Sequence, residues 1–136
     1  MRAVLDTSVV ISSDVQPLEG DLAVSAATLA ELHFGVLVAR DAMVRAERLR
    51  RLSIVERRFE PLPINAAVAR SYGQLASTIA RAGRQARPRV MDLVIAATAH
   101  ACGVRLYTAN PVDLRGLEAQ LDIVAVTTRP KKRRPR

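Results

Sequence analysis

Residues 3–8 read AVLDTS, a short apolar run that ends in an acid and two hydroxyl residues. The run predicts a buried strand, and the polar residues after it predict a helix start, because Asp, Thr and Ser favour helix N-caps. Further apolar runs of strand length lie at residues 22–24, 104–108 and 123–126, with helical patterns between them. Strands that alternate with helices predict an α/β fold whose short, mostly parallel sheet is covered by helices on both faces.

Apolar residues recur at helical spacing between the predicted strands. Val68, Tyr72, Leu75 and Ile79, for example, follow one another at spacings of four, three and four and form one apolar face. On this basis we predict helices over residues 25–40, 41–58, 65–83 and 90–103, and a short helix from residue 111 to about residue 120.

The composition indicates a single soluble globular domain. The chain has 136 residues, of which 49% are apolar and 25% charged, and this length suits one domain. No apolar run approaches the roughly 18 residues of a membrane span, and the apolar start meets Asp6 too early for a signal peptide. The one cysteine, Cys102, excludes a disulfide framework. We therefore expect a cytoplasmic protein that does not enter the membrane.

The net charge of +8, from 21 basic and 13 acidic residues, indicates a polyanionic partner, with nucleic acid ahead of an anionic membrane. Most of this excess lies at the C-terminus, where residues 129–136 (RPKKRRPR) hold six basic side chains and no acid. Residues 1–128 therefore carry a net charge of only +2. We expect residues 1–128 to form the folded domain and residues 129–136 to form a basic, disordered tail.

Asp6, Glu31 and Asp92 are each the only charged residue in an apolar segment of more than ten residues. Burying an isolated carboxylate costs several kcal/mol unless it is paired or binds a cation. Asp6 and Asp113 both follow predicted strands, and open α/β sheets place their ligands at the carboxyl ends of the strands. One shared cation would satisfy these acids together, and hard oxygen ligands without His or Cys favour Mg²⁺ or Mn²⁺.

Each acid also has a purely structural explanation. Asp6 and Asp113 can cap the helices that follow them, and Asp92 can gain from the dipole of its helix. Glu31 is the hardest to explain in this way, since it lies in the middle of an apolar helix with no cap to make. Taken together, the four acids favour a metal site over four separate structural roles.

Other kinds of site lack the residues they need. A phosphate-binding P-loop requires a lysine, but both lysines of the chain, Lys131 and Lys132, lie in the tail. The two histidines and Cys102 do not have the spacing of a zinc site. Aromatic residues make up only 3% of the chain, which is too few for a base-stacking surface.

These features together resemble the PIN-domain nucleases. The resemblance rests on DTS at residues 6–8, the isolated Glu31, DLVIAATA at residues 92–99 and LYTANPVDL at residues 106–114, and it covers residues 2–126. The chain is most similar to the short single-domain toxins of VapBC toxin–antitoxin pairs. The resemblance implies a three-layer PIN fold, with a five-stranded parallel sheet between helices, and metal-dependent endonucleolytic cleavage of RNA.

The resemblance also implies roles for particular residues. Asp6, Glu31 and Asp92 match the most constant acids of the family, and Asp113 matches the fourth acid of some toxins. These four would bind one or two Mg²⁺ or Mn²⁺ ions and carry the reaction. The polar residues that would orient them are Ser8, Thr108 and Asn110, the last in a position where some relatives have an aspartate.

The expected partners are RNA, a VapB-like antitoxin and a second copy of the chain, since similar toxins form dimers and bind an antitoxin near the active site. The apolar face with Leu29, Leu32, Leu37 and Val38 is a candidate for such a contact or for ordinary core packing. The arginine-rich helix over residues 41–58 can guide RNA or form a solvated face. Two other functions stay open: a housekeeping RNA-processing nuclease of the same fold, and a non-catalytic nucleic-acid-binding module.

Overall fold

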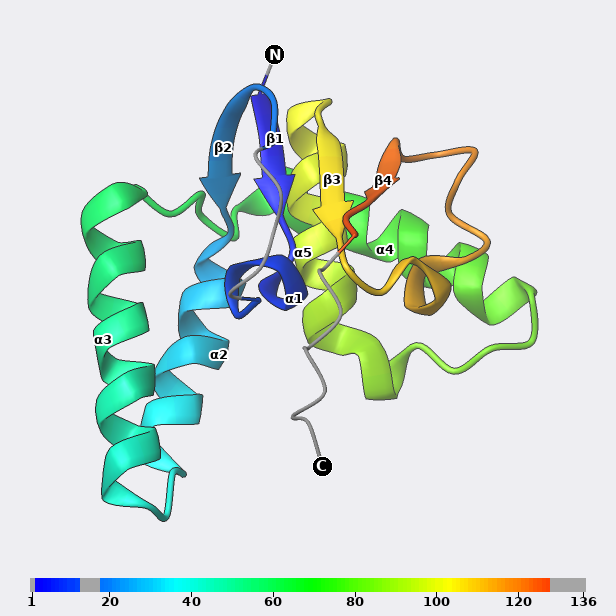
Figure 1. Ribbon diagram of the computed structural model, residues 1–136. Helices are drawn as coiled ribbons and strands as arrows, with labels where there is room; N and C mark the ends of the chain where they lie inside the picture. The colour runs from blue at the N-terminus through cyan, green and yellow to red at the C-terminus, as the bar shows by residue number, and fades with distance from the viewer. Residues whose placement is uncertain (1, 13–17, 128–136) are drawn as a thin grey trace, which may run out of the picture.

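The first apolar run of the chain forms a central strand of a parallel sheet (Figure 1). The computed structural model describes residues 2–12 and 18–127, so the predicted tail lies outside the described residues. The strand order within them is β2-β1-β3-β4, and all neighbours are parallel. The strands are β1 (Arg2–Leu5), β2 (Asp21–Val24), β3 (Arg105–Thr108) and β4 (Ile123–Ala125).

The described residues do not form the fifth strand that the family resemblance implies, so the predicted strand count is wrong. In its place Leu62 makes an isolated parallel bridge with Ser25, just beyond the end of β2. The N–H of Leu62 donates to the carbonyl of Val24 at 2.8 Å. Pro61 and Pro63 flank this residue, and because proline has no N–H to donate, the pairing cannot extend into a ladder.

The helices begin where the sequence supplies a capping side chain. Asp6, Ser25, Asp41 and Asn65 each accept a backbone N–H at the start of α1, α2, α3 and α4. The end of α5 is set by Gly103, whose φ of 66° suits glycine. The helices are α1 (Thr7–Val10), α2 (Ala26–Leu37), α3 (Ala42–Arg58), α4 (Ala66–Arg81) and α5 (Val90–Cys102), with 3₁₀ turns η1 (Arg87–Arg89) and η2 (Pro111–Leu114).

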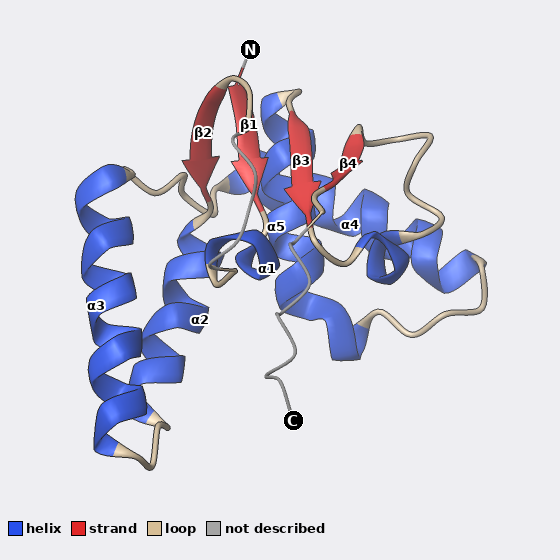
Figure 2. Cartoon of the chain, in the orientation of Figure 1, coloured by secondary structure: helices blue, strands red, loops and turns tan. Residues whose placement is uncertain are grey.

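The two faces of the sheet bury two separate apolar clusters. Val4 and Leu106 join the cluster formed with α4 and α5, whereas Leu5 and Tyr107 join the one formed with α2 and α3. This alternation follows the two-residue period of a strand. The result is the predicted three-layer α/β arrangement, in which α2 and α3 form an antiparallel pair (Figure 2). None of the helices in the described ranges is long and apolar enough to cross a lipid bilayer.

The strands all point the same way, so their carboxyl ends share one edge of the sheet (Figure 1). Asp6 follows β1 at this edge, Ser25 follows β2, and the loop that leads to η2 follows β3. The sequence features singled out for chemistry therefore belong to one end of the fold.

Candidate active site

Four carboxylates from four separate elements line one cavity at the carboxyl edge of the sheet. Asp6 caps α1, Glu31 lies on α2, Asp92 lies in the first turn of α5 and Asp113 lies in η2. The cavity has a volume of about 220 Å³. The structure thus brings together all four acids that the sequence selects, although they are far apart along the chain.

Asp6 is the most constrained of the four acids, with only 7% of its surface exposed. Its Oδ1 accepts the N–H of Thr7 at 3.0 Å. Its Oδ2 accepts the hydroxyls of Ser8 and Thr108, each at 2.8 Å. Three donors on one side chain fix its orientation, so these hydrogen bonds hold the Asp6 carboxyl group in place at the end of β1.

The loop after β3 is fastened to the same two hydroxyls. The N–H of Ala109 donates to Ser8 Oγ, and the N–H of Asn110 donates to Thr108 Oγ1, both at 3.0 Å. Asn110 also lines the cavity. Ser8 and Thr108 therefore contact Asp6 directly, while Asn110 joins the network through its backbone N–H.

Glu31 is positioned by two threonines that sequence analysis did not select as site residues. Thr7 Oγ1 donates to Glu31 Oε1 at 2.7 Å and lies 3.0 Å from Thr28 Oγ1. Thr28 is fully buried and precedes Glu31 by almost one helical turn on α2. That spacing is the only sequence signal for its role, and buried threonines at such positions are common in helices that pack closely.

Asp92 carries the clearest electrostatic signature of the cluster. Burial raises the pKa of Asp92 to about 6, and the negative charges of Asp6, Glu31 and Asp113 add to the effect. The positive charge of Arg89 opposes it. A carboxyl whose charged form is disfavoured by burial and by three like charges gains most from a nearby cation.

The donor chemistry of this cavity suits a hard divalent cation. In the described ranges none of its four acids makes an ion pair with Lys, Arg or His. No three described His, Cys, Asp or Glu side chains already stand in a metal-holding arrangement, so the carboxylates would have to draw closer through side-chain torsions. Carboxylate donors without His or Cys fit Mg²⁺ or Mn²⁺.

Arginine side chains line two hollows that adjoin the acid-lined cavity. A neighbouring hollow of about 250 Å³ shares Glu31 and Asp92 with it and is also lined by Arg87. A second adjoining hollow, of about 480 Å³, also contains Glu31 and is lined by Arg48 and Arg51 of α3. A polyanion that reached the acids would therefore pass arginines from either direction.

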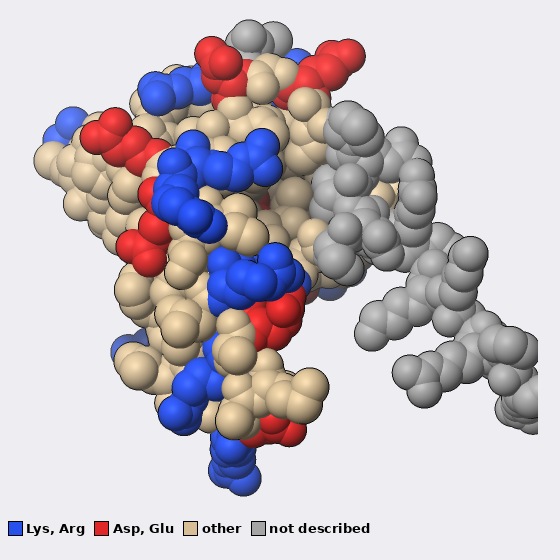
Figure 3. Space-filling model, turned by 60° about the vertical axis from the view of Figure 1, so that its left-hand side comes forward, with Lys and Arg blue, Asp and Glu red and all other residues tan. Residues whose placement is uncertain are grey.

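Five of the six arginines of α3 fall into two groups. Arg45 and Arg48 donate to the carbonyls of Ala39 and Gly35 at 2.9 and 2.8 Å, which ties α3 to the end of α2. A hollow of about 370 Å³, on the face shown in Figure 3, is lined by Arg50, Arg51 and Arg58. Part of the arginine-rich helix is therefore structural, and part borders a surface hollow.

The buried hydroxyl of Thr108 leads to a stability prediction. Thr108→Val keeps the shape but leaves Asp6 Oδ2 with one donor fewer and the Asn110 N–H without its acceptor. We expect the free energy of unfolding to fall by about 1–3 kcal/mol, as measured by urea denaturation at neutral pH. Thr78→Val, which removes an exposed hydroxyl bonded to Gln74 on α4, is the control and should change it by less than about 0.5 kcal/mol. Equal effects of the two substitutions would contradict the prediction.

Comparisons with known proteins identify the family of the chain. A family model described as the PIN domain matches residues 3–112. Ribonuclease VapC5 of Mycobacterium tuberculosis is 36% identical over 131 residues, which cover 90% of this chain and 94% of that protein. Ribonuclease VapC4 of the same organism is 37% identical over 115 residues, covering 80% of this chain and 86% of that protein.

A solved structure extends the similarity to the fold. The crystal structure of VapBC-5 from Mycobacterium tuberculosis, a member of the VapBC family of toxin-antitoxin systems, contains a chain that matches with a TM-score of 0.78 and 35% identity. The match covers 91% of this chain and 98% of that one. The fold is thus that of a known class, the PIN domains. The chain belongs to the PIN domain family and, within it, to the family of the VapC ribonucleases.

Proposed function

We propose that the chain is a metal-dependent endoribonuclease that acts in the cytoplasm as the toxin of a type II toxin–antitoxin pair. The observation that carries the proposal is the convergence of four otherwise isolated carboxylates on one cavity. The similarity to ribonucleases VapC5 and VapC4 over most of the chain supports RNA as the substrate.

The proposed chemistry assigns a task to each group in the cavity. Asp6, Glu31, Asp92 and Asp113 would hold one or two Mg²⁺ or Mn²⁺ ions, which when bound lower the pKa of water and neutralise charge on the reacting phosphate. The hydroxyls of Ser8 and Thr108 keep the carboxylate of Asp6 aimed into the cavity. Asp92 or Asp113 would orient the attacking water for in-line displacement, which leaves 5′-phosphate and 3′-hydroxyl ends.

An antitoxin is the proposed protein partner. On α2, Leu32 is buried in the core and Leu29 is packed against it, so these two belong to the fold itself. Phe34 and Leu37 are 66% and 77% exposed, and the adjoining Val38 is 49% exposed. Phe34 and Val38 also line the hollow that shares Glu31 with the acid cavity. An antitoxin that covered these residues would also lie next to the acids. We also propose a homodimer, on similarity to the family alone.

The experiment that tests this function sequences RNA ends after the chain is produced in a bacterium. We expect growth arrest and new ends with 5′-phosphates in cells that produce the wild type, and neither in cells that produce Asp6→Asn. Arrest with no new ends relative to Asp6→Asn would contradict a ribonuclease. New ends without growth arrest would instead favour a housekeeping RNA-processing nuclease.

A further inference from the structure

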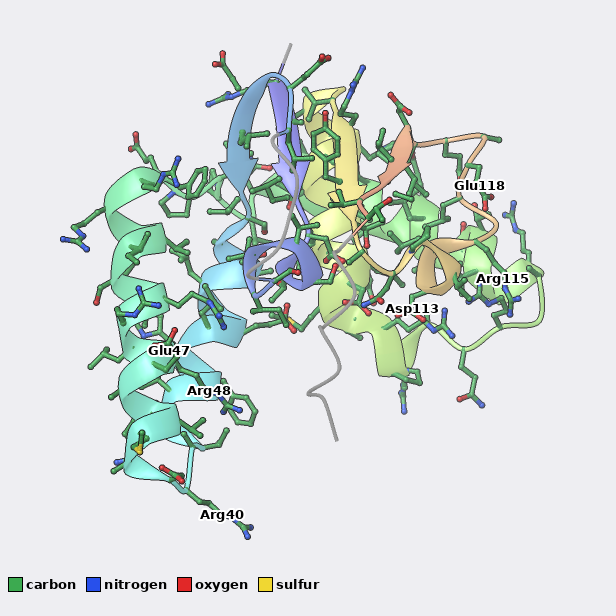
Figure 4. All side chains as sticks on the ribbon, viewed as in Figure 1. Arg40, Glu47, Arg48, Asp113, Arg115 and Glu118 are labelled. Carbon is green, nitrogen blue, oxygen red and sulfur yellow. The ribbon has the colours of Figure 1, made fainter. Side chains whose placement is uncertain are left out.

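The 3₁₀ turn that carries Asp113 is joined to the α4–α5 connection by two arginine side chains. Asp113 and Arg115 of this segment are labelled in Figure 4. Arg89 Nη1 donates to the carbonyl of Asp113 at 2.7 Å. Arg84 Nη1 donates to the carbonyl of Arg115. Both arginines are half-buried, in contrast to the exposed Arg87 between them. The two hydrogen bonds therefore hold the backbone at Asp113 and two residues beyond it.

No backbone hydrogen bond between the two segments accompanies these side-chain bonds in the described part of the chain. Within the turn, the bonds from Asp113 N–H to Asn110 and from Arg115 N–H to Val112 are long, at 3.2 and 3.3 Å. A single 3₁₀ turn with such geometry is weakly held by itself. Leu114 and Leu117 are buried in the core and fix the depth of the turn, and the N–H of Asn110 ties its start to Thr108. The two arginines add the bonds that connect the turn to the α4–α5 connection.

Arg89 also lies close in sequence to a second acid of the cavity. It directly precedes α5 and lies three residues before Asp92, which is in the first turn of that helix. Its bond to the Asp113 carbonyl therefore links the element that carries one acid to the element that carries another. Neither acid belongs to the sheet, so this hydrogen bond is a direct connection between the two elements that carry them.

We propose that Arg84 and Arg89 are positioning residues of the nuclease: they clamp the Asp113 turn to the start of α5 and so set where the Asp113 carboxylate stands. This inference rests on the proposed function, because it concerns an acid of the same site. Both arginines bind backbone carbonyls and not the Asp113 side chain. The Asp113 carboxylate can therefore face the cavity, which it lines.

Arg87 supplies a matched control. It lies on the same connection, two residues from Arg89, and lines the hollow that contains Glu31 and Asp92. The hydrogen bonds to the Asp113 turn come from Arg84 and Arg89 and not from Arg87. Replacing either arginine with methionine removes one positive charge near the acids and keeps the length of the aliphatic stem, but only Arg89→Met opens the clamp.

The test is a double-mutant cycle on RNA cleavage with Asp113→Ala as the second change. A misplacement of about 1 Å at a reacting group can cost roughly a hundredfold in rate, so we expect Arg89→Met to lower kcat about tenfold or more with little change in KM. In the Asp113→Ala background the same substitution should have almost no further effect. Arg87→Met should change KM by a similar factor in both backgrounds. Independent, multiplicative effects of Arg89→Met and Asp113→Ala would overturn the proposal.

Hydrogen exchange measured by mass spectrometry separates the clamp from the activity. We expect faster exchange over residues 110–117 in Arg89→Met and in Arg84→Met, but not in Arg87→Met, with slow exchange retained in α5 in all three. If the wild type fails to cleave RNA, the proposed function is wrong, and the exchange data still decide on the clamp. Unchanged exchange in both clamp variants would refute it. If Arg89→Met unfolds, Arg84→Met carries both measurements.

Discussion

Replacing Asp6 with asparagine is expected to abolish RNA cleavage while leaving the domain folded. The substitution keeps the size of the side chain and an oxygen that can cap α1, but it removes the charge on which the hydrogen bonds of Thr7, Ser8 and Thr108 converge. A cation held by one carboxylate fewer loses several kcal/mol of transition-state stabilisation. A loss of about 4 kcal/mol corresponds to a fall of roughly a thousandfold in kcat/KM. Initial rates on a single-stranded RNA in Mg²⁺ give this ratio.

The control for this measurement is Asp21→Asn. Asp21 is exposed at the start of β2, the opposite end of the sheet from the cavity, so its loss should leave the rate within about twofold. Circular dichroism and urea denaturation establish that both variants are folded. A rate for Asp6→Asn close to that of the wild type would remove Asp6 from the reaction.

The second large effect concerns the stability of the metal-free protein. The pKa of Asp92 is raised to about 6, chiefly by burial and then by Asp6 and Glu31, so the folded state holds this proton more tightly than the unfolded state does. We therefore expect the contribution of Asp92 to the free energy of unfolding to fall as pH rises from about 4 to about 6 and to stay lower above that range. The full shift would correspond to roughly 3 kcal/mol, but solvent screening of a half-buried group brings the expected loss nearer to about 1 kcal/mol.

Asp92→Asn removes this penalty, because an amide is neutral at every pH in the range. In EDTA at pH 7.5 we expect the variant to be more stable than the wild type by about 1 kcal/mol, and the two to converge near pH 4. Thermal and urea unfolding across this pH range provide the measurement, with Asp21→Asn as the matched loss of an exposed carboxylate. Greater stability of the wild type at pH 7.5 would mean that the negative charge of Asp92 does not destabilise the folded state.

Much of the fold follows from local rules that a single sequence displays. The capping roles of Asp41 and Asn65 and the helix end at Gly103 each depend on a few neighbouring residues, so propensity and periodicity suffice to predict them. The acids of the cavity could be selected for the same kind of reason. Asp6 and Glu31 are conspicuous because an apolar segment rarely contains a charge without a purpose.

Other features depend on contacts between distant segments and leave little trace in the sequence. The fifth strand reduces to a bridge at Leu62 because of its two flanking prolines, and the helix predicted from residue 111 to about residue 120 is only the single turn Pro111–Leu114. Gly116, with φ of 99°, interrupts that helix. The support of Glu31 by Thr7 and the bond from Arg89 to Asp113 join residues 24 positions apart, which no local pattern marks.

The central claim is that the acid-lined cavity is a metal-dependent ribonuclease site, and one measurement tests it most directly. Purified protein is freed of metal with EDTA, assayed on a labelled single-stranded RNA, and assayed again after Mg²⁺ or Mn²⁺ is added in excess. We expect no cleavage in EDTA, cleavage with 5′-phosphate ends once the ion is restored, and no restoration in Asp6→Asn. Cleavage that continues unchanged in EDTA, or that Asp6→Asn performs equally well, would contradict it.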